Sequence, residues 1–133
     1  VGALRFLNHV QKRKAVVFLI SDFMDRNYER ELRTTARRHD VIGCPIRDPR
    51  EYQLDNVGLL EVQDPETGEL VLLDTGSETL RATFAARAEQ EHTTLLNQFR
   101  RFEIDTISLD TSRPFVDDVR KLFRQRQVRA RRG

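Results

Sequence analysis

The alternation of apolar and polar positions along the chain predicts three strands that lie between helices. Residues 15–20 form a wholly apolar run rich in valine, leucine and isoleucine, which is typical of a buried parallel strand. This run ends abruptly in Ser21 and Asp22. Residues 41–46 predict a second strand, and residues 104–109 predict a third.

Apolar residues at intervals of three, four or seven predict four helices around these strands. The first covers residues 3–12, and the second carries Tyr28 on its apolar face and ends at His39. A long third helix begins near Thr75 or Ser77, and the fourth contains residues 115–123. The apolar stripe of the long helix is predicted to be core, and it consists of Leu80, Phe84, Ala88, Leu95, Phe99 and Phe102.

Residues 59–62 and 69–73 flank a turn sequence, Asp64-Pro65-Glu66-Thr67-Gly68, and so predict a β-hairpin over about 59–73. The hairpin is predicted to be inserted between α/β units. The whole order is helix, strand, helix, strand, hairpin, helix, strand, helix. Such alternation predicts an α/β fold with a parallel sheet and helices on both faces. Right-handed crossovers would bring the carboxyl ends of the three strands to one edge.

The chain has 133 residues, about one domain, and no apolar run approaches the length of a membrane helix. Its single cysteine, Cys44, excludes an internal disulfide and fits a reducing, cytoplasmic location. The net charge of +2 is unevenly distributed. Residues 124–133 hold five of the 23 basic residues and no acidic ones, so we divide the chain into a domain, 1–123, and a basic tail, 124–133.

Polar residues follow each predicted strand, at the edge of a parallel sheet where ligands usually bind. The expected group is Ser21, Asp22, Asp25, Asp48 and Asp110. Carboxylate and hydroxyl oxygens are the ligands that magnesium prefers, so one interpretation is a magnesium-dependent phosphoryl-transfer or nuclease-like enzyme. Aspartate and serine are also common at these positions because they cap helices and form turns, and this interpretation stays open.

The basic tail suggests a further alternative, in which its arginines neutralise the phosphates of a nucleic acid. Arginine is also favoured at the C-terminal end of a solvated helix, and few aromatic residues are interleaved for base stacking. Charge alone supports nucleic-acid binding, and we expect no nucleic-acid partner.

Several segments, in this order, resemble the C-terminal part of a bacterial family, the domain of unknown function fifty-eight, whose members contain a von Willebrand factor A-like domain. The resemblance extends to about Phe123. The segments that carry it are 16–23, 36–41, 47–51, 57–59, 64–69 and 74–75.

This resemblance implies a Rossmann-like, von Willebrand A-like fold and a role beside MoxR-type AAA+ ATPases. The metal-ion-dependent adhesion site of such domains combines an Asp-x-Ser-x-Ser loop, a threonine and an aspartate after the fourth strand. Asp22 matches that last aspartate, but the sequence has no Asp-x-Ser-x-Ser motif. We therefore expect only the C-terminal half of the full domain, with a partial metal site at Asp22 that binds magnesium only in the intact parent protein.

The missing half would leave an unpaired edge on the strand at 15–20, and exposed strand edges pair with other chains. We therefore expect the isolated chain to self-associate. The leading interpretation is a non-catalytic protein-interaction module without a cofactor of its own, an adaptor or chaperone partner of a MoxR-type ATPase. It would dock that partner through the carboxyl edge of its sheet.

Overall fold

The protein is described from a computed structural model, which covers residues 2–25, 27–64 and 67–132. Pro65 and Glu66 of the predicted hairpin turn lie outside the described residues. The chain divides into two compact units, one comprising Val1–Arg47 and Leu95–Gly133 and the other Asp48–Thr94. Each unit is described by itself.

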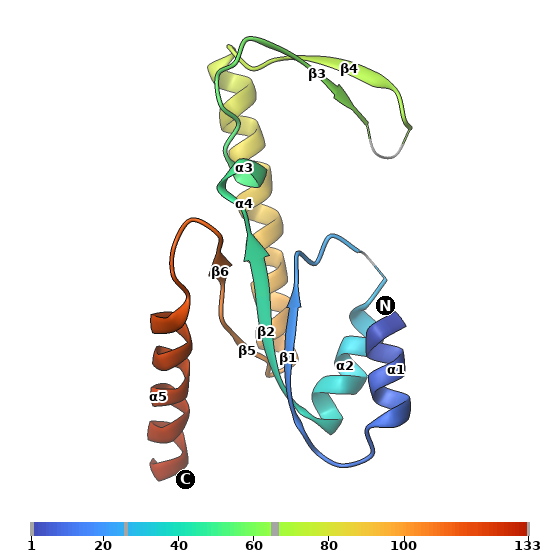
Figure 1. The fold of residues 1–133 in the computed structure, drawn as a ribbon, viewed down its shortest axis with the longest axis vertical. Coiled ribbons are helices and arrows are strands. Elements are labelled where there is room, and N and C mark those ends of the chain that lie inside the picture. Colours follow the sequence, from blue (N-terminus) through green and yellow to red (C-terminus); the bar gives the residue numbers. More distant parts are fainter. Residues whose placement is uncertain (1, 26, 65–66, 133) are drawn as a thin grey trace. The chain divides into compact units, whose positions relative to one another are not determined.

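The first unit contains a small parallel sheet with helices on both faces (Figure 1). Its elements are α1 (Gly2–Val10), β1 (Val16–Ser21), α2 (Glu29–Arg38), β2 (Asp40–Arg47), the end of α4 (Glu78–Arg101), β5 (Asp105–Thr106), β6 (Leu109–Asp110) and α5 (Val116–Arg132). The mixed α/β order and the parallel sheet agree with the sequence prediction, and this architecture is compatible with a Rossmann-like fold.

Strand β2 lies at the centre of the sheet. It pairs in parallel with β1, from Val16 opposite Asp40 to Ser21 opposite Pro45. On its other side it pairs first with β5 and then with β6. The third predicted strand, 104–109, is therefore two short strands instead of one. Ile107 lies between them, where its N–H donates to the Gly43 carbonyl at 2.9 Å and its side chain is buried.

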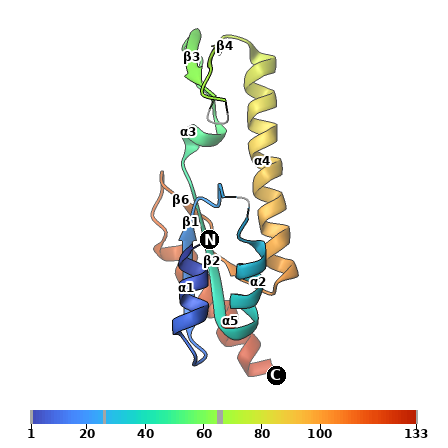
Figure 2. The ribbon, with the colours of Figure 1, turned by 90° about the vertical axis from the view of Figure 1, so that its right-hand side faces the viewer.

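Two separate apolar clusters hold helices against the two faces of the sheet, because side chains alternate along each strand. The first cluster joins α1, α2 and the end of α4 to one face, through Leu4, Leu32, Val41, Phe99 and Ile104. The second joins α5 to the other face, through Ile42, Cys44, Ile107 and Leu122. Figure 2 shows α1 and α2 in front of the sheet and α5 behind it.

The buried residue Cys44 belongs to the cluster beneath α5. Its burial raises the pKa of the thiol above the ordinary value. Phe99 lies on the opposite face of β2 and is fully buried against Gly43, where a β-carbon would meet its ring. Glycine at position 43 therefore allows the close packing of α4 on the sheet.

Two predictions about burial are wrong. Strand β1 is not buried on both faces, because Val16, Phe18 and Ile20 are exposed on the α5 side. The stripe of the long helix is core only near its C-terminal end, where Phe99 is buried, whereas Phe84 is exposed. Periodicity identifies an apolar face but does not show how much protein is available to cover it.

The second unit contains α3 (Pro49–Tyr52), an antiparallel hairpin of β3 (Leu59–Gln63) and β4 (Leu70–Asp74), and the start of α4. The hairpin agrees with the predicted range, and Gly68 takes the positive φ of 75° that favours glycine at the turn. The buried hydroxyl of Thr75 accepts the Val57 N–H at 2.9 Å and donates to the Gly58 carbonyl at 2.5 Å. Thr75 thus closes the base of the hairpin.

Helix α5 continues through the basic segment, so residues 124–132 are helical. Its first turn contains the acidic residues Asp117 and Asp118, whose negative charges interact favourably with the positive end of the helix dipole. Among the described residues, the structure contains no helix that is both long and apolar enough to cross a membrane.

Candidate interaction surface

Strand β1 has one open edge, because among the described strands it pairs only with β2. The Asp40 N–H donates to the Ala15 carbonyl at 2.9 Å, so the backbone groups of Ala15 face β2. Because these directions alternate along a strand, Val16, Phe18 and Ile20 direct their N–H and C=O groups to the open edge.

The same three residues expose their side chains on the α5 face of the sheet. Val16 is 56% exposed, Phe18 is 47% exposed and Ile20 is 58% exposed. Helix α5 packs on β2, and the ring centre of its Phe123 lies 6.5 Å from that of Phe18. We call the unpaired edge of β1 together with these exposed side chains of Val16, Phe18 and Ile20 the open side of β1.

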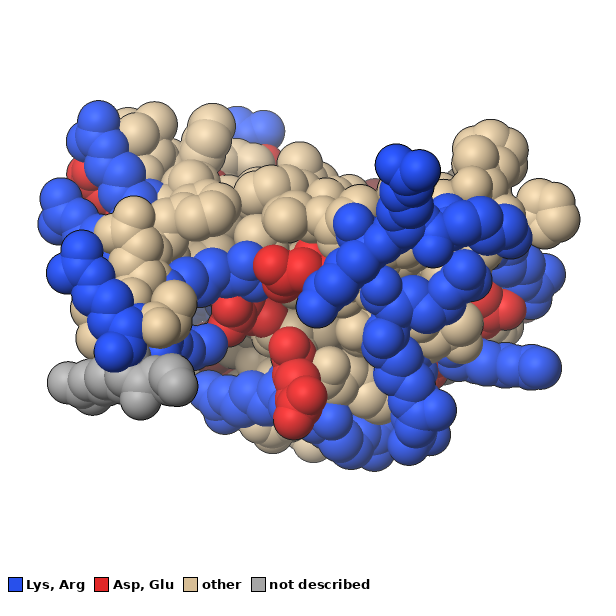
Figure 3. Space-filling model, turned by 90° about the horizontal axis from the view of Figure 1, so that it is seen from below, with Lys and Arg blue, Asp and Glu red and all other residues tan. Residues whose placement is uncertain are grey.

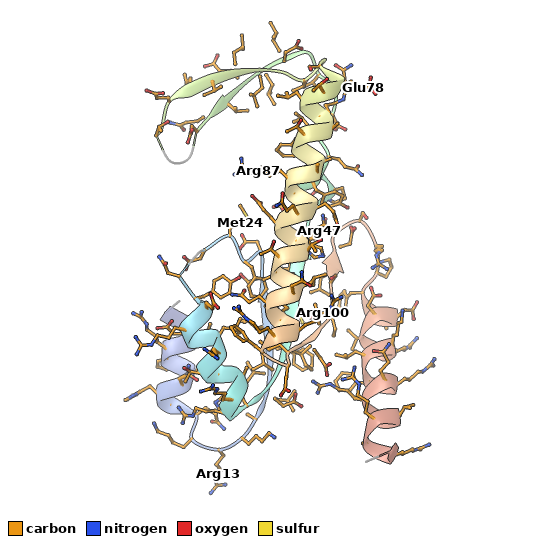
Figure 4. The ribbon with its side chains drawn as sticks, turned by 180° about the vertical axis from the view of Figure 1, so that it is seen from behind. Arg13, Met24, Arg47, Glu78, Arg87 and Arg100 are labelled. Atoms are coloured by element: carbon orange, nitrogen blue, oxygen red, sulfur yellow. The ribbon has the colours of Figure 1, made fainter. Side chains whose placement is uncertain are left out.

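Charged residues flank the open side of β1 at both ends. Lys14 precedes the strand and Asp22 follows it, and both are exposed. Figure 4 labels Arg13 on the loop before β1 and Met24 on the loop after it, at opposite ends of the strand. Inside the strand, residues 16–21 contain neither a charge nor a proline, the usual features that protect an edge from pairing.

The structure uses the predicted site residues Ser21 and Asp22 in a local turn after β1. The Asp22 carboxylate accepts the Met24 N–H at 3.2 Å, and the Ser21 hydroxyl accepts the Phe23 N–H at 3.0 Å. These bonds accompany the left-handed conformation of Phe23, with φ of 57°. Both side chains thus stabilise the turn that carries the chain from β1 towards α2.

The other predicted carboxylates make similar local bonds. Asp25 accepts the Asn27 N–H at 3.5 Å, and Asp110 accepts the Ser112 N–H at 2.8 Å. Asp48 belongs to the second unit, where it forms a capping box at the start of α3. These hydrogen bonds are those expected of residues that cap helices or form turns.

Within the first unit, Asp22 follows β1 and Asp110 is the last residue of β6, and these two strands lie on opposite sides of β2. Two strand spacings, roughly 10 Å, therefore lie between the ends of β1 and β6. Within the described ranges, no three histidine, cysteine, aspartate or glutamate side chains form a group that could hold a metal ion. The partial metal site at Asp22 stays a prediction about the intact parent.

At the other end of the sheet, basic side chains lie beside acidic ones, as the blue and red groups in Figure 3 show. There Arg126 of α5 bonds Asp40 through both terminal nitrogens, each at 2.8 Å, and bonds Asp105 at 2.7 Å. The Asp40 and Asp105 carboxylates raise the pKa of Arg126. Arg129 also bonds Asp105, at 3.0 Å. Two arginines of the predicted tail thus attach α5 to the sheet.

Sequence reasoning missed Val16, Phe18 and Ile20 as surface residues. An apolar run that fills both faces of a strand reads as buried, and in a complete sheet it is. The signal available in the sequence was indirect, because the expected absence of neighbouring strands already implied an open edge at residues 15–20.

Comparison with known proteins identifies a family for most of the chain. The profile of the family described as "Protein of unknown function DUF58" matches residues 1–94. No solved structure matches the chain. The family resemblance drawn from the sequence motifs is confirmed.

Curated relatives of the chain include uncharacterized proteins from mycobacteria. The chain is 29% identical over 132 residues to the uncharacterized protein MAV169 of Mycobacterium avium, covering 98% of this chain and 78% of the relative. It is 30% identical to the uncharacterized proteins Rv1480 of Mycobacterium tuberculosis and Mb1516 of Mycobacterium bovis. The chain again aligns over 98% of its length but spans 41% of these two relatives.

Proposed function

The chain belongs to the family of unknown function DUF58, and from this premise we propose that it is a non-catalytic protein-interaction module. The observation that carries the proposal is the open side of β1. There the alternate residues Val16, Phe18 and Ile20 have both unpaired backbone groups at the strand edge and exposed apolar side chains. Both features are stabilised when another polypeptide covers them, by hydrogen bonds along the edge and by burial of the side chains.

The size of the gain favours a protein contact at the open side of β1. Fully burying a valine, isoleucine or phenylalanine is worth about 1.5–3 kcal/mol relative to exposure, and these three residues are each about half exposed. Covering them therefore contributes roughly 2–4 kcal/mol, before the backbone bonds are counted. We also propose that the isolated chain self-associates through this side.

A second part of the proposal concerns the cellular partner. The family resemblance suggests that the parent protein is an adaptor or chaperone for a MoxR-type AAA+ ATPase. Ser21 ends β1, and Asp22 and Asp25 lie exposed on the loop after it, at the carboxyl edge of the sheet, where that ATPase would dock. Asp110, the last residue of β6, belongs to the same unit and to the proposed set, whereas Asp48 lies in the second unit and stays a prediction from the sequence.

Titration of the chain with the purified MoxR-type ATPase from the same organism tests the adaptor proposal. The chain is kept at concentrations where light scattering gives a monomer mass, and binding is followed by fluorescence anisotropy. We expect the double substitution Asp22→Ala and Asp25→Ala to weaken binding about tenfold, as for the loss of two interface charges. Asp117→Ala on α5 is the matched control, because its side chain is 93% exposed.

The two possible failures have different meanings. Absence of binding by the unsubstituted chain would overturn the ATPase as partner. Binding that Phe18→Asp weakens and the double substitution leaves unchanged would overturn the carboxyl edge as its docking site and move the contact to the open side of β1.

A further inference from the structure

We infer that the second unit of this protein docks, through its acidic side chains, on the basic amino edge of the sheet in a second copy. Charge is divided very unequally between the two units. The first unit has 20 basic and 10 acidic residues, a formal charge of +10, whereas the second has 3 basic and 11 acidic residues, a formal charge of −8. The inference goes beyond the proposed function, because it uses neither the open side of β1 nor the carboxyl edge.

The positive charge of the first unit gathers at the amino edge of the sheet, where the parallel strands begin and the helices between them end. Exposed cations lie in the loop between α1 and β1 and in the last turn of α2, just before β2. Figure 3 faces this end of the sheet and shows many blue groups and fewer red ones. We call this surface the basic edge, and it consists of Lys12, Arg13, Lys14, Arg37 and Arg38.

The basic edge keeps its charge within its own unit. None of its five side chains forms an ion pair with a carboxylate of the described residues, and Arg38 donates instead to the Asn8 carbonyl at 2.7 Å. The carboxylates nearest in the fold, Asp40 and Asp105, are already bonded by Arg126. The basic edge therefore remains available to an anionic partner.

The second unit presents the opposite charge on its hairpin and beside it. Within the part of the chain that the structure describes, Asp55, Glu61, Glu69 and Glu78 form no ion pair with a cation. All four are exposed. Glu61 lies on β3, Glu69 directly precedes β4, and Figure 4 labels Glu78 at the start of α4. The second unit thus carries a set of unneutralised carboxylates on a short, folded element.

Helix dipoles explain only part of this charge pattern. Arg37 and Arg38 suit the negative end of α2, and Glu78 suits the positive end of α4. Lys14 lies outside any helix, however, and Glu61 lies on a strand, where glutamate is depleted. The separation of charge between the units therefore exceeds what the helix ends require, and recognition between surfaces gives a physical reason for it.

Cover for these two surfaces must carry the opposite charge, because charged side chains are almost never buried unless they are paired. This holds whatever else the parent protein contains. Both surfaces exist in the same chain, so the second unit of one copy supplies the anions that the basic edge of another accepts. Like charges within each unit repel, and the approach of the opposite unit relieves that repulsion.

The contact is head-to-tail, since it joins two different surfaces, and it repeats from copy to copy to form rings or chains. Each copy uses its basic edge for one neighbour and its second unit for the next. Because the contact is built from exposed charges, it is weak in high salt, where the screening length shortens. These two properties separate it from an apolar contact at the open side of β1.

Sedimentation velocity over a range of chain concentrations tests the inference. At about 0.05 M salt we expect the average mass to rise with concentration, and about 0.5 M salt should weaken this association roughly tenfold. Lys12→Glu with Lys14→Glu, and Glu61→Lys with Glu69→Lys, should each weaken it roughly tenfold as well.

An equimolar mixture of these two double variants should associate, because each variant supplies the surface that the other has lost. Lys121→Glu with Arg124→Glu is the matched control, since it changes the net charge by the same amount at two exposed positions of α5. This control should associate more strongly than the variant at positions 12 and 14.

Recovery in the mixture would support the head-to-tail contact. A chain that stays monomeric at every concentration in low salt would overturn it. Association that Phe18→Asp abolishes and both charge reversals leave unchanged would also overturn it, because that contact would belong to the open side of β1.

A monomer that binds polyuridylate RNA, and loses this binding with Lys12→Glu and Lys14→Glu, would overturn the second copy and assign the basic edge to nucleic acid. Head-to-tail association without binding of the ATPase would support this inference and overturn only the adaptor proposal.

Discussion

Arg126 and Asp40 form a two-pronged ion pair that joins helix α5 to the start of strand β2. The Arg126 Nη1 and Nη2 atoms lie 2.8 Å from the two Asp40 carboxylate oxygens, while Nε bonds Asp105 at 2.7 Å. Geometry of this kind suits the planar guanidinium group and is the strong form of the arginine–carboxylate interaction. The Arg126 side chain is only 21% exposed, so solvent screens it less than most surface pairs.

We expect Arg126→Met to destabilise the protein by about 1–2 kcal/mol, because the substitution leaves Asp40 and Asp105 without their shared cation. Methionine keeps most of the apolar stem, so the loss reports the guanidinium group. Urea unfolding measures the change. Arg124→Met, two residues nearer the start of α5 at an exposed position, is the control, and an equal loss in both variants would contradict the role of Arg126.

Gly43→Ala should destabilise the protein by roughly 1–3 kcal/mol, because its β-carbon would lie 2.8 Å from Cδ2 of the buried Phe99 ring. Gly2→Ala is the control, since a β-carbon there meets nothing within 4 Å. Phe99→Leu should recover part of the loss when combined with Gly43→Ala. Thermal unfolding of the two single variants and the pair measures this coupling, and strictly additive losses would argue against a steric origin.

Stability should fall in acid partly through Glu31. Its carboxylate accepts a hydrogen bond of 2.8 Å from the Arg5 Nε, and this bond holds the pKa of Glu31 below the ordinary 4.5. The folded state thus binds this proton less readily than the unfolded state. The contribution is complete above pH 4.5 and is lost as the pH falls through the lowered pKa.

Urea unfolding of Glu31→Gln as a function of pH measures this contribution. The difference in unfolding free energy between wild type and variant should shrink as the solution is made acidic. Arg5→Gln should reproduce the effect, because it removes the donor. A difference between wild type and Glu31→Gln that is constant with pH would contradict the assignment.

We expect magnesium and manganese to give the isolated chain no stabilisation that depends on Asp22. One carboxylate supplies far fewer oxygen ligands than either ion needs. A thermal-shift titration of wild type beside Asp22→Ala measures this. A rise in unfolding temperature that the substitution abolishes would reverse the expectation and favour the magnesium-dependent enzyme, which is then tested by divalent-dependent turnover.

The elements of the fold that could be predicted from the sequence are those that local pattern determines. Strands β1 and β2, the hairpin and the long helix fall close to their predicted ranges, because hydrophobic period and turn residues suffice for them. Residues 104–109 could not be resolved in this way. Their apolar pattern suits one strand, but pairing with β2 stops after the Ile107 N–H bond to Gly43 and resumes at Leu109, which is a tertiary effect.

The sequence predicted where the strands end, but it did not predict which side chains of β1 are exposed. Asp22 follows β1 and Asp110 ends β6, yet each accepts a hydrogen bond from the backbone N–H two residues further along, and sequence cannot separate a turn residue from a ligand. The exposure of Phe18 depends on which neighbours β1 lacks, and a single chain's periodicity carries no such information. Similarly, the sequence predicts Arg126 to be part of a charged tail, whereas in the folded structure it bonds Asp40, which is distant in sequence.

The buried thiol of Cys44 gives this protein an internal reporter of local opening. It lies beneath α5, and its burial keeps the reactive thiolate scarce by raising the pKa. A disulfide reagent can therefore modify it only in the fraction of molecules in which α5 has detached from β2. The rate of that reaction therefore reports how often the helix leaves the sheet. The sequence has no second cysteine that could also react.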